Sequence, residues 1–461
     1  MDRARQAVFG GGSSQEEYEP LTGEEDGAAL EGSAVLENQD EIPFSWIEYC
    51  IFGFLGVAML WAWNMFLAAA PYFASRFSSN AWIQTNFQSG ILTVSTITNL
   101  SVLIILSNVQ YSASYPYRIN LALIINIVIF VLLTASTALF LDASPTAYFA
   151  FLLTMVAFSS WATGLIQNGA FAFAASYGRP EYMQALMAGQ GVAGVLPAVA
   201  QVSTVLLFPP REPSSPSNSH GDDKPSQRGE SSAFLYFLAA VTISITALIA
   251  LNPLFRRHNR RIENKLVHHM AESMNSIEEA ERAARKVTSL WVLFRKLRWL
   301  AIGVAVTFAV TMFFPVFTAK IHSVREDAGA IFRPTAFIPL GFVFWNLGDL
   351  GGRIATMLPF SLQHRPFVLF LLAVVRAALL PLYLLCNVNG RGAVVSSDFF
   401  YLFVVQVVFG FTNGWLGSSF MMASGQWVDE GEREATGGFM GLFLVIGLTT
   451  GSLLSFTVSG I

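Results

Sequence analysis

The sequence predicts an all-α polytopic membrane protein with eleven membrane-spanning helices. Of its 461 residues, 53% are hydrophobic and only 13% are charged, whereas a soluble domain carries about 25% charged residues. Apolar runs of about 20 residues, the length that crosses a bilayer, recur along the chain beyond Pro43. Short polar or Gly/Pro-containing segments separate these runs, as expected between helices.

Residues 1–44 form an acidic, Gly- and Ser-rich segment that cannot bury a core, and we expect it to be a disordered tail. It contains no apolar stretch typical of a cleavable signal peptide, so the first spanning helix is expected to direct insertion. Within the tail, Glu17-Tyr18-Glu19-Pro20-Leu21 resembles tyrosine-based and acidic-leucine sorting signals, although such short patterns also arise by chance. The tail therefore weakly favours a vacuolar or lysosomal type of membrane over the plasma membrane.

The predicted helices follow the apolar runs. They lie at 45–73, 83–107, 119–141, 147–177, 181–208, 233–254, 298–320, 332–360, 366–387, 398–423 and 434–459. The break between the fourth and fifth helices rests on Tyr177-Gly178-Arg179-Pro180, because Gly followed closely by Pro stops one helix and starts another.

Basic residues predict the orientation of these helices. The segment 256–298 holds eleven Lys or Arg against five Glu, so the loop 255–297 is expected in the cytoplasm. An even number of helices precedes it, which also puts the N-terminus in the cytoplasm. The loop would separate a six-helix bundle, 45–254, from a five-helix bundle, 298–461, as in transporters built from two rocking bundles. Apolar residues at 262–277 suggest a surface helix on anionic lipid, or the basic residues only fix topology.

The segment from Phe332 to Phe360 carries an aspartate and an arginine near its middle. Each charge costs roughly 2.5–3.5 kcal/mol at the centre of a membrane helix. Asp349 and Arg353 are four residues apart and can therefore pair on one helical face, with Asn346 on the same stripe. The pair could simply hold two helices together, but intramembrane charges more often mark a transport path. The segment therefore predicts a polar transport site.

Gly348 and Gly352 form a G-x-x-x-G pattern, which lets a second helix approach this one closely. Similar glycine sets occur at 189–194 and 437–451, and we interpret them as packing seams without a binding role.

Amide and indole side chains lie inside two other predicted helices. Trp63 and Asn64 are in the first, where an indole face could stack on a planar ring. Gln167 is in the fourth, and its amide can donate and accept hydrogen bonds at the edge of a base. Each amide alone is more often a helix–helix hydrogen bond, but Trp63, Gln167, Asp349 and Arg353 together favour stacking, base-edge and hydroxyl recognition in one site.

The sequence contains no motif of a nucleotide hydrolase, a metalloprotease or a serine hydrolase, so we expect no enzymatic activity and no cofactor. Cys50 and Cys386 lie in apolar runs and are too few for a disulfide framework or a metal cluster.

Four motifs resemble those of the equilibrative nucleoside transporter family. They are Trp63-Asn64-Met65-Phe66, Gly189-Gln190-Gly191-Val192-Ala193-Gly194, Asn346-Leu347-Gly348-Asp349-Leu350-Gly351-Gly352-Arg353 and Thr412-Asn413-Gly414-Trp415-Leu416. The resemblance extends over nearly all of the chain beyond residue 45. Two positions depart from it, because Ala62 replaces a proline and Trp415 replaces a tyrosine.

The resemblance implies a major-facilitator-like 6+5 arrangement, alternating access, and nucleosides, sometimes nucleobases, as substrates. Asp349 and Arg353 would then bind the ribose hydroxyls, Gln167 would read the base and Trp63 would pack against the nucleoside. Asn64 and Asn346 are the remaining candidate binding residues, and the lipid bilayer is the expected surrounding. We expect a monomer with no nucleic-acid partner and no metal.

Three questions stay open in the sequence. A porter for another polar metabolite, such as a sugar, is the first rival, and a receptor or channel is the second. Transport could be passive or proton-linked, although the arginine beside Asp349 argues against that carboxylate as a proton carrier.

Overall fold

The computed structural model describes residues 43–108, 114–139, 143–207, 225–272, 289–359, 362–455 and 457. The acidic tail with its Tyr18–Leu21 pattern and residues 208–224, which begin at the end of the fifth predicted helix, lie outside the described residues. Ser45–Ile461 form one compact unit, and its described part consists almost entirely of helices. The all-α prediction is confirmed.

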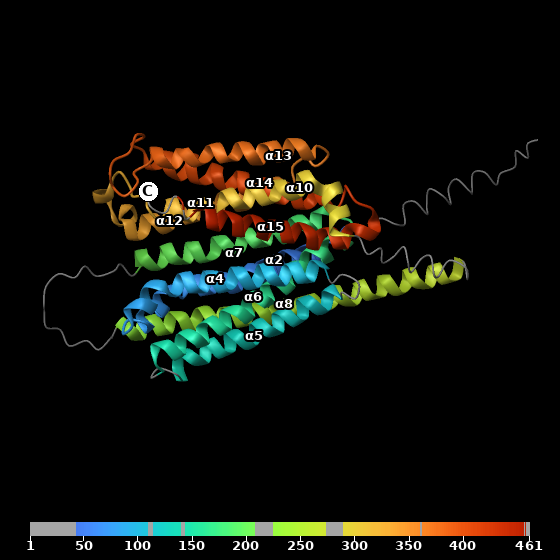
Figure 1. The fold of residues 1–461 in the computed structure, drawn as a ribbon, viewed down its shortest axis with the longest axis horizontal. Coiled ribbons are helices and arrows are strands. Elements are labelled where there is room, and N and C mark those ends of the chain that lie inside the picture. The colour runs from blue at the N-terminus through green and yellow to red at the C-terminus, as the bar shows by residue number, and fades with distance from the viewer. Residues whose placement is uncertain are drawn as a thin grey trace, which may run out of the picture. The chain divides into compact units, whose positions relative to one another are not determined.

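Two groups of helices lie side by side (Figure 1), blue to yellow-green in the first group and yellow to red in the second. The first group contains α2 (Trp46–Ala68), α3 (Ala70–Arg76), α4 (Ala81–Asn108), α5 (Tyr115–Leu139), α6 (Pro145–Ser176), α7 (Pro180–Leu207) and α8 (Pro225–Glu272). The second contains α10 (Leu290–Thr311), α11 (Phe313–Thr318), α12 (Pro334–Ala355), α13 (Pro366–Val375), η3 (Arg376–Leu385), η4 (Phe400–Val407), α14 (Val408–Ser424) and α15 (Arg433–Ser455). Short 3-10 turns lie at Glu326–Ala328, Ala330–Phe332 and Glu430–Glu432.

Ten helices among the described residues are long and apolar enough to cross a membrane. They correspond to ten of the eleven predicted spans. The remaining predicted span is α12, which has 22 residues but is not among the ten. At 1.5 Å per residue it is about 33 Å long, enough to cross a bilayer. It carries Asn346, Asp349 and Arg353, and these polar residues make it less apolar than the other ten spans.

Several helix boundaries differ from the predictions. The break before Pro180 is confirmed, since α6 ends at Ser176 and Gly178 adopts a φ of +66° in the turn. By contrast, α8 continues without interruption to Glu272, past the predicted end at residue 254, and extends beyond its neighbours in Figure 1. The segment 262–272 therefore continues a spanning helix, where a separate surface helix was one of the two interpretations. Asn99 lies inside α4.

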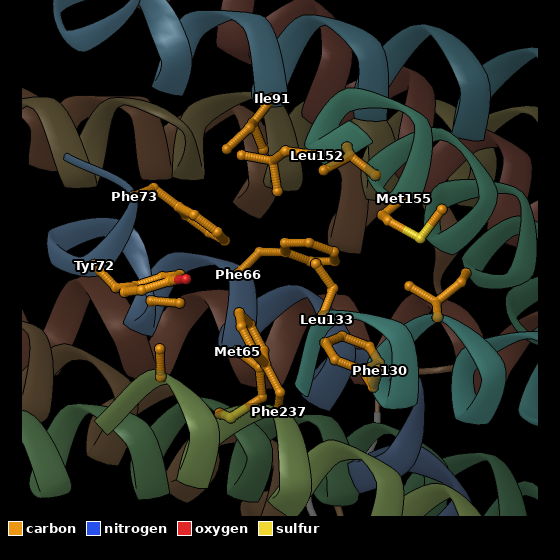
Figure 2. Close-up of a cluster of buried hydrophobic side chains, with 14 of the residues drawn as sticks. Met65, Phe66, Tyr72, Phe73, Ile91, Phe130, Leu133, Leu152, Met155 and Phe237 are labelled. Carbon is orange, nitrogen blue, oxygen red and sulfur yellow. The ribbon is translucent and has the colours of Figure 1, made fainter. Parts of the chain in front are cut away.

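The core of the first group is an aromatic and aliphatic cluster, shown in Figure 2. Met65 and Phe66 of α2 meet Phe130 of α5 and Phe237 of α8 there. A second cluster, which includes Phe317, Phe337 and Tyr383, fills the second group. Each group therefore has its own apolar core. The groups touch through α7 against α12 and α14, and through α15 against α4 and α6.

Candidate functional site

Glycine residues bring α12 against α14 so closely that the two backbones touch. A Cβ on Gly352 would overlap the carbonyl oxygen of Phe411, and one on Gly414 would overlap the carbonyl oxygen of Asp349. Gly348 and Gly410 are placed in the same way. The predicted close approach at Gly348 and Gly352 is therefore confirmed, and it fixes Asp349 beside α14.

The other glycine sets are packing seams as predicted. Gly189 lies against the backbone of Gly53 in α2. Gly437 contacts the backbone of Phe171 in α6, and Gly451 contacts the backbone of Ala309 in α10.

Asp349 and Arg353 form a buried ion pair within α12. Arg353 Nε donates to Asp349 Oδ2 at 2.7 Å, and the two residues are 3% and 5% exposed. The other oxygen, Asp349 Oδ1, accepts a hydrogen bond of 2.6 Å from Asn413 Nδ2 of α14. The pairing predicted from the four-residue spacing is present, and a third residue completes it.

Arg353 also reaches α7, which belongs to the first group. Its Nη1 donates to the carbonyl oxygen of Met187 at 2.7 Å and to Gln190 Oε1 at 3.2 Å. In return, Gln184 Nε2 donates to the carbonyl oxygen of Arg353 at 3.1 Å. The charged pair thus holds the two groups together where the C-terminal part of α12 meets the N-terminal part of α7. Within the first group, Tyr49 of α2 donates to Gln184 at 2.6 Å.

Two predicted site residues each contact the middle of α7. Asn64 Nδ2 donates to the carbonyl oxygen of Ala193 at 2.7 Å. Asn346 Nδ2 donates to Phe342 within its own helix, while its Oδ1 faces Gly194. Asn64 of α2 and Asn346 of α12 therefore contact consecutive residues of α7 from its two sides.

Trp63 and Gln167 lie elsewhere in the first group. Trp63 is half-buried and packs on the aromatic cluster of Figure 2. Gln167 is 5% exposed, and its Oε1 accepts a hydrogen bond of 3.4 Å from Asn99 Nδ2 of α4. Asn99 Oδ1 is buried without a partner in the part of the chain that the structure describes. Gln167 is thus brought to Asn99 and makes no hydrogen bond to the Asp349–Arg353 pair.

Several polar residues at this site were not predicted from the sequence. Asn413 and Gln190 lie inside two of the quoted motifs, but their partners are on other helices. Arg376 is a charge inside the predicted helix 366–387, a signal that could have identified it; it is 3% exposed and donates to α10 and α14. Thr311 of α10 donates to Asn413 Oδ1 at 2.5 Å, a contact between two helices that the sequence alone could not have predicted.

The site retains unused hydrogen-bonding capacity. A carboxylate accepts at about four lone-pair positions, and Asp349 uses two of them. Within the described residues, Arg353 Nη2 and Gln167 Nε2 have no hydrogen-bond partner. Asp349 can therefore accept, and Arg353 can donate, further hydrogen bonds to a polar ligand. No group of three or more possible metal ligands occurs in the described ranges.

Comparisons with known proteins agree with this description. A family model described as "Nucleoside transporter" matches residues 153–459, more than half of the chain. The chain is 29% identical over 454 residues to "Nucleoside transporter FUN26" of Saccharomyces cerevisiae, covering 89% of this chain and 83% of that protein. It is 25% identical over 476 residues to "Equilibrative nucleoside transporter 1" of Homo sapiens, covering 91% and 97%.

Solved structures share the fold. The proton:xylose symporter XylE of the major facilitator superfamily superimposes with a TM-score of 0.58 at 11% identity, covering 89% of this chain and 88% of that one. FucP in its outward conformation, from the same superfamily, gives 0.54 at 12% identity, covering 89% and 91%. The predicted major-facilitator-like arrangement is confirmed at the level of the fold.

Proposed function

The chain belongs to the nucleoside transporter family, and from this premise we propose that its substrate site is built around Asp349 and Arg353. It is a multi-pass integral membrane protein that moves nucleosides across a bilayer by alternating access. Two helix groups with separate apolar cores suit such a mechanism, because each can move as a unit while the contacts between them change.

In this proposal the ribose binds at Asp349 and Arg353. The carboxylate accepts hydrogen bonds from the vicinal hydroxyls, and Arg353 donates to sugar oxygens. The observation that carries the assignment is the unused capacity of a buried, fully oriented ion pair at the junction of α7, α12 and α14. Asn64 and Asn346 line the site beside α7, as their contacts with Ala193 and Gly194 support.

The base is assigned to the first group. The free Nε2 of Gln167 would donate to an acceptor on the base, and Trp63 would pack against the nucleoside. Its ring would then supply a stacking contact of about 1–3 kcal/mol, by analogy with base stacking on aromatic side chains. Substrate would bridge the two groups in this arrangement and so couple its own binding to their relative movement.

We place the N-terminus in the cytoplasm because of the basic segment after α8. The hydrogen bonds of Arg353 to α7 and of Gln184 to the Arg353 carbonyl oxygen then lie toward the cytoplasmic side. They support a conformation that is closed there, so that substrate would enter from the opposite side. Release into the cytoplasm would require Arg353 to leave Met187 and Gln190.

Transport is proposed to be passive. Asp349 is the carboxylate partner of the buried Arg353, so a proton carried by Asp349 would leave the arginine charge uncompensated. Imposing a pH gradient on sealed proteoliposomes should therefore produce no accumulation of labelled uridine above equilibrium. Accumulation that collapses with a protonophore would refute passive transport.

A sugar porter is the alternative function. The fold is similar to that of XylE, and a carboxylate–arginine pair can bind any vicinal diol. The decisive experiment is uptake of labelled uridine and adenosine by vesicles of purified protein. We expect saturable uptake that excess glucose does not inhibit. Inhibition by glucose but not by other nucleosides would favour the sugar porter, and uptake that never saturates would favour a channel.

Three further assignments rest on the sequence. We propose that the protein acts as a monomer and that free nucleobases are weaker substrates, since they lack the ribose that Asp349 would bind. The Tyr18–Leu21 pattern suggests a vacuolar or lysosomal membrane. Replacing Tyr18 and Leu21 with alanine should move a tagged protein to the cell surface, and an unchanged distribution would remove the pattern from consideration.

A further inference from the structure

Asn413 is an amide whose two ends are chemically different but similar in shape. Its Nδ2 donates to Asp349 Oδ1 at 2.6 Å, and the residue is 1% exposed. Only the donor end can stabilise a carboxylate, since the other end would set one acceptor against another. The orientation of this amide therefore decides whether Asp349 is held or repelled.

Thr311 supports that orientation. Its hydroxyl donates to Asn413 Oδ1 at 2.5 Å and also lies 2.8 Å from the carbonyl oxygen of Thr307. Because a carboxylate only accepts, the NH2 end of Asn413 faces Asp349, and its Oδ1 at the other end accepts from the Thr311 hydroxyl. Thr311 belongs to α10 and Asn413 to α14, so the contact also fixes the distance between these helices.

Arg376 of η3 holds the same two helices, α10 and α14, together. Its Nη1 donates to the carbonyl oxygen of Thr307 at 2.9 Å, and its Nη2 to that of Phe409 at 3.1 Å. Its Nε donates to Thr412 Oγ1 at 3.1 Å, and its guanidinium lies 4.0 Å from the centre of the Phe409 ring. A buried cation with three hydrogen bonds thus ties α10 to α14 one turn from the Thr311–Asn413 contact.

We propose that Asn413 and Thr311 are positioning residues for ribose recognition, a role that rests on the proposed assignment of ribose to Asp349. They hold Asp349 Oδ1 in one place while Arg353 holds Oδ2, and the remaining lone pairs of the carboxylate are thereby aimed at the substrate. Loss of the Thr311 hydroxyl releases the amide to rotate. Asp349 then keeps its charge, but its carboxylate is no longer held in one orientation.

Two threonines on α10 provide a matched test. Thr311 and Thr307 are 8% and 0% exposed, but the hydroxyl of Thr307 donates only to the carbonyl oxygen of Gly303 in its own helix. Thr311→Val and Thr307→Val make the same change of shape. The readout is the ratio of inhibition constants of 2′,3′-dideoxyuridine and uridine against adenosine uptake in proteoliposomes, with the uptake rate measured alongside.

We expect Thr311→Val to lower this ratio by about tenfold, because the Asn413 amide would no longer be held in place to donate to Asp349. One hydrogen bond to a charged group has an effect of about this size. Thr307→Val should keep the wild-type ratio, and so should Thr311→Ser, which retains the hydroxyl. Asn413→Leu should lower the ratio as well, and adding Thr311→Val to it should lower the ratio no further, because both changes break one interaction.

An unchanged ratio in Thr311→Val would overturn this inference, as would an equal loss in Thr311→Ser, which would point to packing of the methyl group. Failure of the ribose assignment itself is distinguishable, since wild-type protein would then show no preference for uridine over the dideoxy analogue.

Discussion

Replacing Arg353 with lysine keeps the positive charge and removes the planar fork, and it should nearly abolish transport. The guanidinium spans two helices, since Nε binds Asp349 while Nη1 binds Met187 and Gln190 of α7. A lysine ammonium is a single point and cannot reach the carboxylate and the α7 acceptors together. We therefore expect two of the three hydrogen bonds to be lost.

Each hydrogen bond to a charged group contributes about 1.5–3 kcal/mol, so two of them amount to at least about 3 kcal/mol. At about 1.4 kcal/mol per factor of ten, the uptake rate at low uridine concentration should fall roughly a hundredfold or more. Arg365 provides the matched control, because it is exposed at the start of α13, and Arg365→Lys should transport normally.

The assay is initial-rate uridine uptake in proteoliposomes, normalised to the amount of folded protein in each preparation. A thermal unfolding curve of each variant in detergent separates lost function from lost folding. If Arg353→Lys folded and transported within threefold of wild type, Arg353 could not be both a substrate ligand and the bridge to α7.

Further outcomes are expected at other sites. Gln167→Ala should weaken adenosine, inosine and uridine unequally, by about 1–3 kcal/mol where a buried polar group loses its partner; equal wild-type affinities in competition assays would exclude base reading. Gly352→Ala should destabilise the protein by about 1–3 kcal/mol in thermal unfolding, since its Cβ would overlap the Phe411 carbonyl. The adjacent Gly351→Ala has room, and an equal effect there would refute the packing argument. Gln190→Leu should make a cysteine introduced on the cytoplasmic half of α7 more reactive toward a soluble maleimide, and unchanged labelling would remove Gln190 from the closed contact.

Local sequence pattern was sufficient for the spans and for the charged pair. Apolar runs located the helices, and a spacing of four residues placed Asp349 and Arg353 in contact, because both features depend only on one helix. Pro180 and Gly178 located the break between α6 and α7 for the same reason. The unbroken length of α8 was missed, because polar residues beyond a membrane helix do not stop it from continuing as a helix into water.

Contacts between helices could not be read from the sequence. Asn64, Gln167 and Asn413 are all amides in apolar runs, yet their partners are a backbone carbonyl, a second amide and a carboxylate. Which partner each meets depends on how α2, α6 and α14 pack, and no local pattern encodes that packing. Arg376 was overlooked although its charge is visible in the sequence, because its partners, two backbone carbonyls and the Thr412 hydroxyl, lie on other helices.

The most direct test of the ribose site is competition in the wild-type protein. Uridine and 2′,3′-dideoxyuridine are compared as inhibitors of labelled adenosine uptake by proteoliposomes at neutral pH. A buried pair that binds hydroxyls disfavours an analogue without them, because Asp349 and Arg353 would then keep unpaired polar groups. We predict that uridine inhibits at a concentration lower by about tenfold or more, equivalent to at least ~1.4 kcal/mol. Equal inhibition by the two nucleosides would contradict ribose recognition by Asp349 and Arg353.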